Sequence, residues 1–187
     1  KLNPHWEQLA NAMQFSECIP TINLWNVQLD QSTLQMIEAS LRQKGIARFD
    51  LAHNQFLGGE GVKFAVDVLK SNRSVEHFCW EDNSFHSTQD ACDLIDAVLE
   101  HPEIYELDLT RSLNGNIILL QRLFSGALGT DTLLDVNLSG NQIRTNGDRC
   151  IPNFLSTNPP LEMLDLEGNQ LTDDDAIRIT AIKYSFE

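Results

Sequence analysis

Basic residues are scarce in this sequence. Its 187 residues include 13 Lys and Arg against 27 Asp and Glu, which gives a formal net charge of −14 at pH 7. Binding to nucleic acid or to anionic lipid depends on clustered Lys and Arg that neutralise phosphate. The charge balance therefore argues against a nucleic-acid partner and against docking on an anionic membrane.

Long apolar runs are missing as well. No stretch of about 18 apolar residues is present, so we expect no membrane insertion. The four cysteines, Cys18, Cys79, Cys92 and Cys150, form no CxxC pair and fit no zinc spacing. We therefore expect reduced thiols, no metal or cofactor, and an intracellular location, with the cytoplasm favoured over the nucleus or an organelle.

A repeated pattern dominates what is present. Apolar residues recur at positions 1, 4, 6 and 11 of a unit, with Asn at position 9, and the units begin at residues 19, 46, 75, 104, 133 and 161. The steps between units are 27 to 29 residues, the regular spacing expected of a stacked solenoid. Two units depart from the pattern: the first has Val27 at position 9, and the fourth has Ser112 there, followed by Asn114 at position 11.

The pattern predicts a short strand and a turn in each unit. Apolar positions 4 and 6 alternate with polar positions 5 and 7, which is typical of a strand with one buried side. A position 9 amide carries both donors and an acceptor, so it can satisfy the unpaired backbone of the turn. We predict a ladder of such amides, formed by Asn54, Asn83, Asn141 and Asn169.

Helical spacing follows most of the strands. Apolar residues recur at i, i+3, i+4 and i+7 in segments 61–70 and 88–99, and later equivalents are expected at 117–128, 147–155 and 174–182. Residues 4–16 also read as a helix, whose Trp6, Leu9 and Met13 would cover the exposed core of the first unit.

A strand and a full helix within 28–29 residues resemble the ribonuclease-inhibitor-like leucine-rich repeat proteins. The motifs that carry the resemblance are LAHNQF (51–56), LSGNQI (138–143) and LEGNQL (166–171). The resemblance implies an α/β fold, a curved solenoid of right-handed βα repeats with a parallel concave sheet and convex helices. We expect a capping helix over residues 1–18 and six repeats over 19–187, with further repeats or a partner following.

The concave face of such a solenoid is built from positions 2, 3, 5, 7 and 8. Ten acidic residues fall on these positions but only two basic ones, Arg48 and Arg111. One interpretation is an acidic trough that steers a basic partner; the other is that acidic residues are simply common there. The candidate partner-binding residues are Asn23, Trp25, Arg48, Asp50, His53, His77, Glu81, Tyr105, Asp108 and Arg111.

The predicted function is protein binding rather than catalysis, by a scaffold or regulator that could be one subunit of a larger assembly. Asp50 and Asp108 are two strands apart, too far to share a proton and too open for a buried acid. We expect Trp25 to contact the partner, although it could instead pack under the first helix, and we interpret His53 and His77 as ordinary surface histidines rather than metal ligands. Two alternatives stay open: a GTPase-activating regulator that uses Arg48 or Arg111, and a cytoskeletal capping module.

Overall fold

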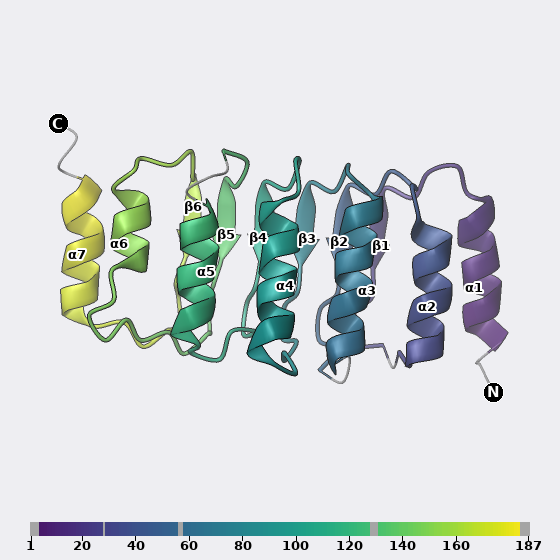
Figure 1. Ribbon diagram of the computed structural model, residues 1–187, viewed down its shortest axis with the longest axis horizontal. Coiled ribbons are helices and arrows are strands. Elements are labelled where there is room, and N and C mark those ends of the chain that lie inside the picture. Colours follow the sequence, from purple (N-terminus) through teal and green to yellow (C-terminus); the bar gives the residue numbers. More distant parts are fainter. Residues whose placement is uncertain (1–3, 28, 56–57, 128–130, 184–187) are drawn as a thin grey trace.

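The protein is an open stack of strand–helix units, one beside the next (Figure 1). This computed structural model describes residues 4–27, 29–55, 58–127 and 131–183. The helices all lie on one face of a single sheet, and the two ends of the chain lie at opposite ends of the stack (Figure 1). This is the curved α/β solenoid predicted from the repeats.

The sheet is parallel and its strands follow sequence order. The strands are β1 (Thr21–Asn23), β2 (Arg48–Asp50), β3 (His77–Cys79), β4 (Glu106–Asp108), β5 (Asp135–Asn137) and β6 (Met163–Asp165). Each pairs with the next so that equivalent repeat positions stand side by side; Asp50, for example, pairs with Cys79 and Cys79 with Asp108. The predicted register therefore holds along the described sheet.

Seven helices cover the other side of the strands in the described part of the chain. They are α1 (Pro4–Phe15), α2 (Gln31–Leu41), α3 (Gly58–Ser71), α4 (Thr88–Leu99), α5 (Ile117–Ala127), α6 (Cys150–Leu155) and α7 (Asp173–Lys183). Helix α2 was not predicted from the sequence; Asp30 caps its first turn by accepting a hydrogen bond from Thr33 N at 2.8 Å.

Helix α6 begins three residues later than predicted. Asn146 and Gly147 both have positive φ, which breaks the helical path, and the Asp148 carboxylate then accepts a hydrogen bond from Cys150 N at 2.7 Å. The predicted end of the preceding helix, Leu128, lies outside the described residues.

The core lies between the sheet and the helices. Phe49, Phe78 and Trp80, from strand positions 4 and 6, are fully buried. The Phe49 ring packs against Phe78 at 5.7 Å between centroids and against Phe64 of α3 at 5.9 Å. Burying each large apolar side chain contributes about 1.5–3 kcal/mol, so this layer fixes the strands from behind.

Side chains at position 9 join each repeat to the one before it. The Asn141 amide donates to Leu109 O at 2.8 Å and accepts from Leu113 N at 2.6 Å. Asn169 makes the same kind of pair with Leu138 O and Ile143 N, at 2.9 and 3.0 Å. Asn54 and Asn83 likewise donate to a carbonyl of the preceding repeat.

The fourth repeat keeps this connection with a different residue. The Ser112 hydroxyl, which is buried, donates to Trp80 O at 2.6 Å. Leu113 then fills the core position, whereas Asn114 is exposed with a φ of 49°. The assignment of Asn114 to the apolar position 11 is therefore wrong by one residue.

Helix α1 lies beside α2 at the start of the stack (Figure 1). Met13 is buried and Trp6 packs partly against the core, but Leu9 is 41% exposed. Two of the three residues expected to cover the first repeat thus contact the core, and Leu9 does not contribute as expected.

No helix in the described residues is long and apolar enough to cross a bilayer.

Candidate functional site

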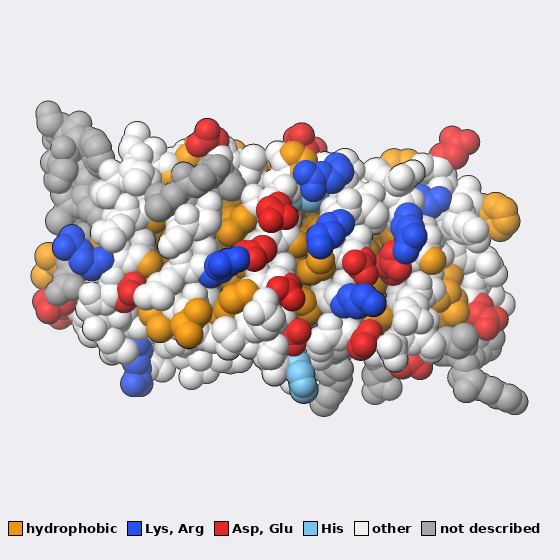
Figure 2. All heavy atoms as spheres, viewed as in Figure 1, with side chains coloured by type: hydrophobic (Ala, Val, Ile, Leu, Met, Phe, Trp, Pro, Cys, Tyr) orange, Lys and Arg blue, Asp and Glu red, His pale blue; other side chains and the backbone are white. Residues whose placement is uncertain are grey.

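The face of the sheet opposite the helices carries most of the unbalanced acidic charge. Figure 2 shows the helix-bearing face, where Lys and Arg side chains lie among Asp and Glu. Only two of the 13 basic residues occupy strand-face positions, compared with ten of the 27 acidic ones. Eight of the fourteen net negative charges therefore belong to the strand-bearing face, which is the main candidate for a binding surface.

A buried charged cluster occupies its centre. The His77 ring nitrogens lie 3.2 Å from Asp50 Oδ1 and 2.6 Å from Glu106 Oε2, which places one imidazole between carboxylates of β2 and β4. Arg48 Nε donates to Asp50 Oδ2 at 2.9 Å. His77 and Asp50 are each only 6% exposed. The expectations of a surface histidine and of an open carboxylate are both wrong here, because neighbouring strands bring these side chains together and cover them.

The cluster shifts the titration of its members in opposite directions. Burial alone would lower the pKa of His77, but the contacts with Asp50 and Glu106 outweigh it and raise the pKa above its usual 6.5. Burial would raise the pKa of Asp50, but His77 and Arg48 lower it. The two ring nitrogens and Asp50 Oδ1 lie at ion-pair distance without well-aligned hydrogen bonds. These contacts are ion pairs when His77 is protonated.

A second histidine lies between carboxylates nearer the edge of the face. His53 Nδ1 lies 2.8 Å from Asp82 Oδ2, and its Nε2 lies 3.5 Å from Glu81 Oε1. The Trp25 ring meets the His53 ring edge-on, with 5.4 Å between centroids. Trp25 nevertheless remains 58% exposed. It thus does not pack under the first helix, and it presents a large aromatic surface held by His53.

The remaining candidates fall into distinct environments. Asn23 and Arg111 are exposed, Tyr105 is 38% exposed, and Asp108 is half-buried. Arg111 Nη2 lies 3.9 Å from Glu81 Oε1, a weak contact for an exposed guanidinium. The structure thus joins His53, Glu81 and Arg111 in one group but leaves Tyr105 apart from it.

Backbone conformation marks this face in a way that the sequence analysis missed. Position 8 has a positive φ in all six repeats, at Asn26, His53, Asp82, Arg111, Gly140 and Gly168. Glycine and asparagine adopt this conformation at little cost, whereas His53 and Arg111 pay a steric penalty there. Side chains kept at a strained position are a feature of functional surfaces.

Two further features were also missed. Met163, at position 3 of the sixth repeat, is 50% exposed and adds apolar surface to β6. The Cys79 sulfur and carboxylate oxygens of Glu81 and Asp108 lie within 4.8 Å of one another, a spacing that a divalent cation could bridge. Burial raises the pKa of the Cys79 thiol to about 12, so at neutral pH this ligand would first have to lose a proton. The alternation of side chains along each strand was the sequence signal that could have placed Cys79 beside Asp108, since both occupy position 5 of neighbouring repeats.

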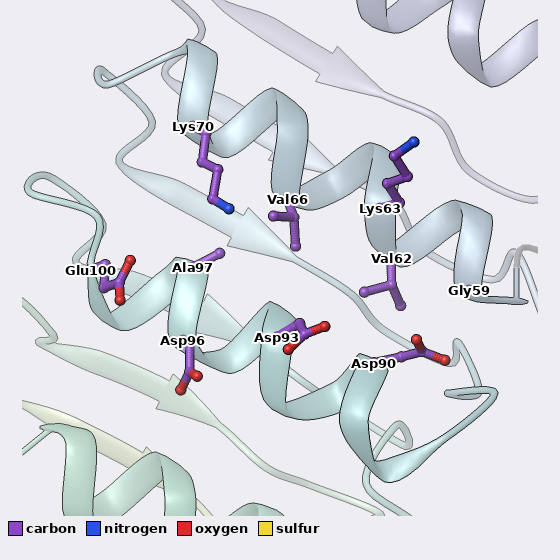
Figure 3. Close-up of a pocket in the computed structure, with 10 residues that line it drawn as sticks. All are labelled: Gly59, Val62, Lys63, Val66, Lys70, Asp90, Asp93, Asp96, Ala97 and Glu100. Atoms are coloured by element: carbon purple, nitrogen blue, oxygen red, sulfur yellow. The ribbon is translucent and has the colours of Figure 1, made fainter.

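The helix-bearing side has a groove of its own, between α3 and α4 (Figure 3). It encloses about 440 Å³, with Lys63 and Lys70 on the α3 side and four carboxylates on the α4 side. One of these, Asp96, is engaged by Arg122 of α5. The opposite charges of the two walls partly offset each other, unlike the charges of the strand-bearing face.

Comparison with known proteins agrees with this architecture. A leucine-rich repeat family model matches residues 157–179. The tropomodulin C-terminal domain of Caenorhabditis elegans superposes with a TM-score of 0.62 at 14% identity, covering 82% of this chain and 92% of that one. The fold is a leucine-rich repeat solenoid. No curated relative matches the sequence, and the ribonuclease-inhibitor-like subfamily remains a prediction from the motifs.

Proposed function

We propose that this leucine-rich repeat domain is a protein-binding module whose partner lies against the strand-bearing face. The observation that carries the proposal is Trp25, a tryptophan left 58% exposed and braced by His53 at the open face of the sheet. Exposed Trp side chains bury much area on binding at a low cost in entropy, which is why they dominate the energetics of interfaces.

Other features of the strand-bearing face support the same proposal. Tyr105 and Met163 add apolar surface farther along the sheet, and the acidic excess suits a partner with a basic surface. The strained backbone at His53 and Arg111 costs stability without filling the core, which favours a role for their side chains in recognition.

A position-specific cross-linker tests the proposal. Tyr105→p-benzoylphenylalanine places a photoreactive group on the strand-bearing face, and Ile118→p-benzoylphenylalanine places the same group on α5, where Ile118 is 56% exposed. We expect one protein to cross-link in cell extract from position 105 and not from position 118. Cross-linking of that protein from position 118 alone would move the interface to the helices.

The fold similarity supports a second candidate, a cytoskeletal capping module of the tropomodulin kind. An elongation assay with labelled actin filaments tests it: a capping module slows subunit addition at substoichiometric amounts. Unchanged elongation at saturating protein would remove this candidate and leave the general binding role intact.

A GTPase-activating role gains less support. Arg48 is held by Asp50 at 2.9 Å, so its guanidinium is already committed, and the exposed Arg111 would have to supply the transition-state charge. Single-turnover GTP hydrolysis with Arg111→Ala separates this role from binding, since equal rates for the variant and the parent protein would exclude it.

A further inference from the structure

The acidic charge of the strand-bearing face is neutralised at one end and left open at the other. In the N-terminal part, Arg48 and His77 contact Asp50, and His53 lies between Glu81 and Asp82. These carboxylates already have cationic or titratable partners within the chain. They therefore offer little free charge to another molecule.

The C-terminal part differs. No basic side chain among the described residues lies within ion-pair distance of five carboxylates on or beside β4, β5 and β6. These five, called the open acidic patch below, are Asp108, Asp135, Glu162, Asp165 and Glu167. Uncompensated carboxylates on one face repel one another, and a cationic partner would relieve that repulsion.

Two members of the patch are also held in place. Asp108 Oδ1 accepts a hydrogen bond from Thr110 N at 2.8 Å, and Asp165 Oδ1 accepts one from Glu167 N at 2.8 Å. These bonds orient each carboxylate without neutralising its charge. Asn137, which stands between them in the register, makes the same bond to Ser139 N at 3.0 Å. The patch is thus preorganised, and this reduces the entropy lost on binding.

Apolar surface flanks the carboxylates. Tyr105 lies just before β4 and Met163 begins β6, and both are exposed. The aliphatic stem of Lys or Arg packs on such side chains while its charged end reaches a carboxylate, and a Tyr ring attracts a guanidinium over its face. This combination favours Lys and Arg side chains over a simple inorganic cation.

We propose that the open acidic patch binds an extended, basic segment of the partner that runs across β4 to β6. This inference rests on the proposed binding function and specifies which chemistry the partner brings to which end of the face. Asp108 and Asp165 are two strands apart, about 9.6 Å at about 4.8 Å per strand. A polyproline II segment is extended and completes one turn in three residues, over about 9.3 Å, so every third side chain returns to the same side. The segment therefore carries Lys or Arg at every third position.

Defined peptides test the spacing. A fluorescent 12-residue peptide with Arg at every third position among Ser and Gln is titrated against the whole chain, beside a peptide of identical composition with its arginines adjacent. We expect the spaced peptide to bind at least about fivefold more tightly, since only it reaches both carboxylates without bending. Equal affinity of the two peptides would overturn the spacing.

Charge-neutralising variants test the location. The triple variant Asp108→Asn, Asp135→Asn, Asp165→Asn removes three charges, and Asn137 shows that Asn keeps the local backbone bond. The matched control Glu60→Gln, Asp93→Asn, Glu100→Gln removes three charges from α3 and the α4 region. We expect binding of the spaced peptide to weaken at least about tenfold in the first variant and less than about twofold in the second. Equal weakening in both would show a long-range effect of net charge and contradict a local site.

Two further outcomes distinguish binding of a basic segment from a metal site and from the general binding function. Loss of peptide binding on adding EDTA would assign the patch to a metal bridged by Cys79, Glu81 and Asp108 rather than to a direct contact, and would overturn the proposal. Unchanged affinity of the cross-linked partner for the triple variant, with binding lost in Trp25→Ala, would leave the binding function standing and refute the basic segment.

Discussion

The Ser112 hydroxyl donates to the carbonyl oxygen of Trp80 at 2.6 Å, the same kind of bond that Asn141 makes to Leu109 O one repeat later. A serine thus takes the place of an asparagine in the ladder that ties each repeat to the one before it. We expect Ser112→Ala to lower the free energy of unfolding by about 1–3 kcal/mol, because it leaves a buried carbonyl unsatisfied. Urea unfolding measures this, with the exposed Ser125→Ala of α5 as the control; equal stability of the two variants would contradict the role of Ser112.

The contribution of each position 9 asparagine to the free energy of unfolding should depend on how deeply it is buried. Asn141 is completely buried, whereas Asn169 of the sixth repeat is only half-buried. We therefore expect Asn141→Ala to cost about 1–3 kcal/mol and Asn169→Ala clearly less, since water can reach the groups left behind. Thermal and urea unfolding of the two variants give the comparison, and a larger loss at Asn169 would be inconsistent with the ladder.

The strands and their register could be predicted from the sequence, but the contacts between side chains of neighbouring strands could not. The period and the alternation at positions 4 and 6 were enough to place β1 to β6 in register. The sequence could not show that His77 would be enclosed by Asp50 and Glu106, because that depends on which side chains meet across strands 27 to 29 residues apart. It also could not reveal the positive φ at Arg111, because the backbone conformation is imposed by the stacked turn rather than by the residue.

The two buried histidines should respond to pH in opposite directions. The pKa of His77 is raised in the fold, so its stabilising contribution is full below pH 6.5 and is lost as the pH rises through the folded value. Burial lowers the pKa of His101, which donates to Asn72 O at 3.0 Å, so the fold disfavours its charged form and loses stability as the pH falls below 6.5.

Unfolding free energies between pH 5 and 9 test this contrast. Relative to the parent protein, His77→Asn should lose most stability at the acidic end, and His101→Asn should lose most at the alkaline end. Parallel pH profiles for the two variants would show that neither shift is linked to folding.

Backbone strain at position 8 predicts that a glycine there stabilises the fold. Arg111 holds a φ of 53°, and Gly140 occupies the equivalent place in the next repeat without a side-chain penalty. We expect Arg111→Gly to raise the free energy of unfolding by about 0.5–1 kcal/mol, since the steric cost outweighs the exposed contact with Glu81. Calorimetric melting measures the gain; a lower melting temperature would mean that Arg111 stabilises the fold.

Thiol reactivity should distinguish the exposed Cys18 from the less accessible Cys79 and Cys150. Burial raises the pKa of Cys79 and of Cys150 to about 12, whereas Cys18 is exposed. Only the thiolate attacks iodoacetamide, so at pH 8 we expect Cys18 to be alkylated on the order of 100-fold faster than Cys79 or Cys150. Mass spectrometry of timed samples measures the rates, and fast labelling of Cys79 would indicate that the centre of the face opens readily.

The most direct test of binding through the strand-bearing face is the Kd of the purified, cross-linked partner, measured by calorimetry for two variants. Trp25→Ala with Tyr105→Ala removes exposed aromatic surface from the strands, and Ile118→Ala removes exposed apolar surface from α5. We predict a Kd at least about tenfold weaker for the first variant, because aromatic side chains carry much of the binding energy, and an unchanged Kd for the second. An unchanged Kd for the first and a weakened one for the second would contradict the account.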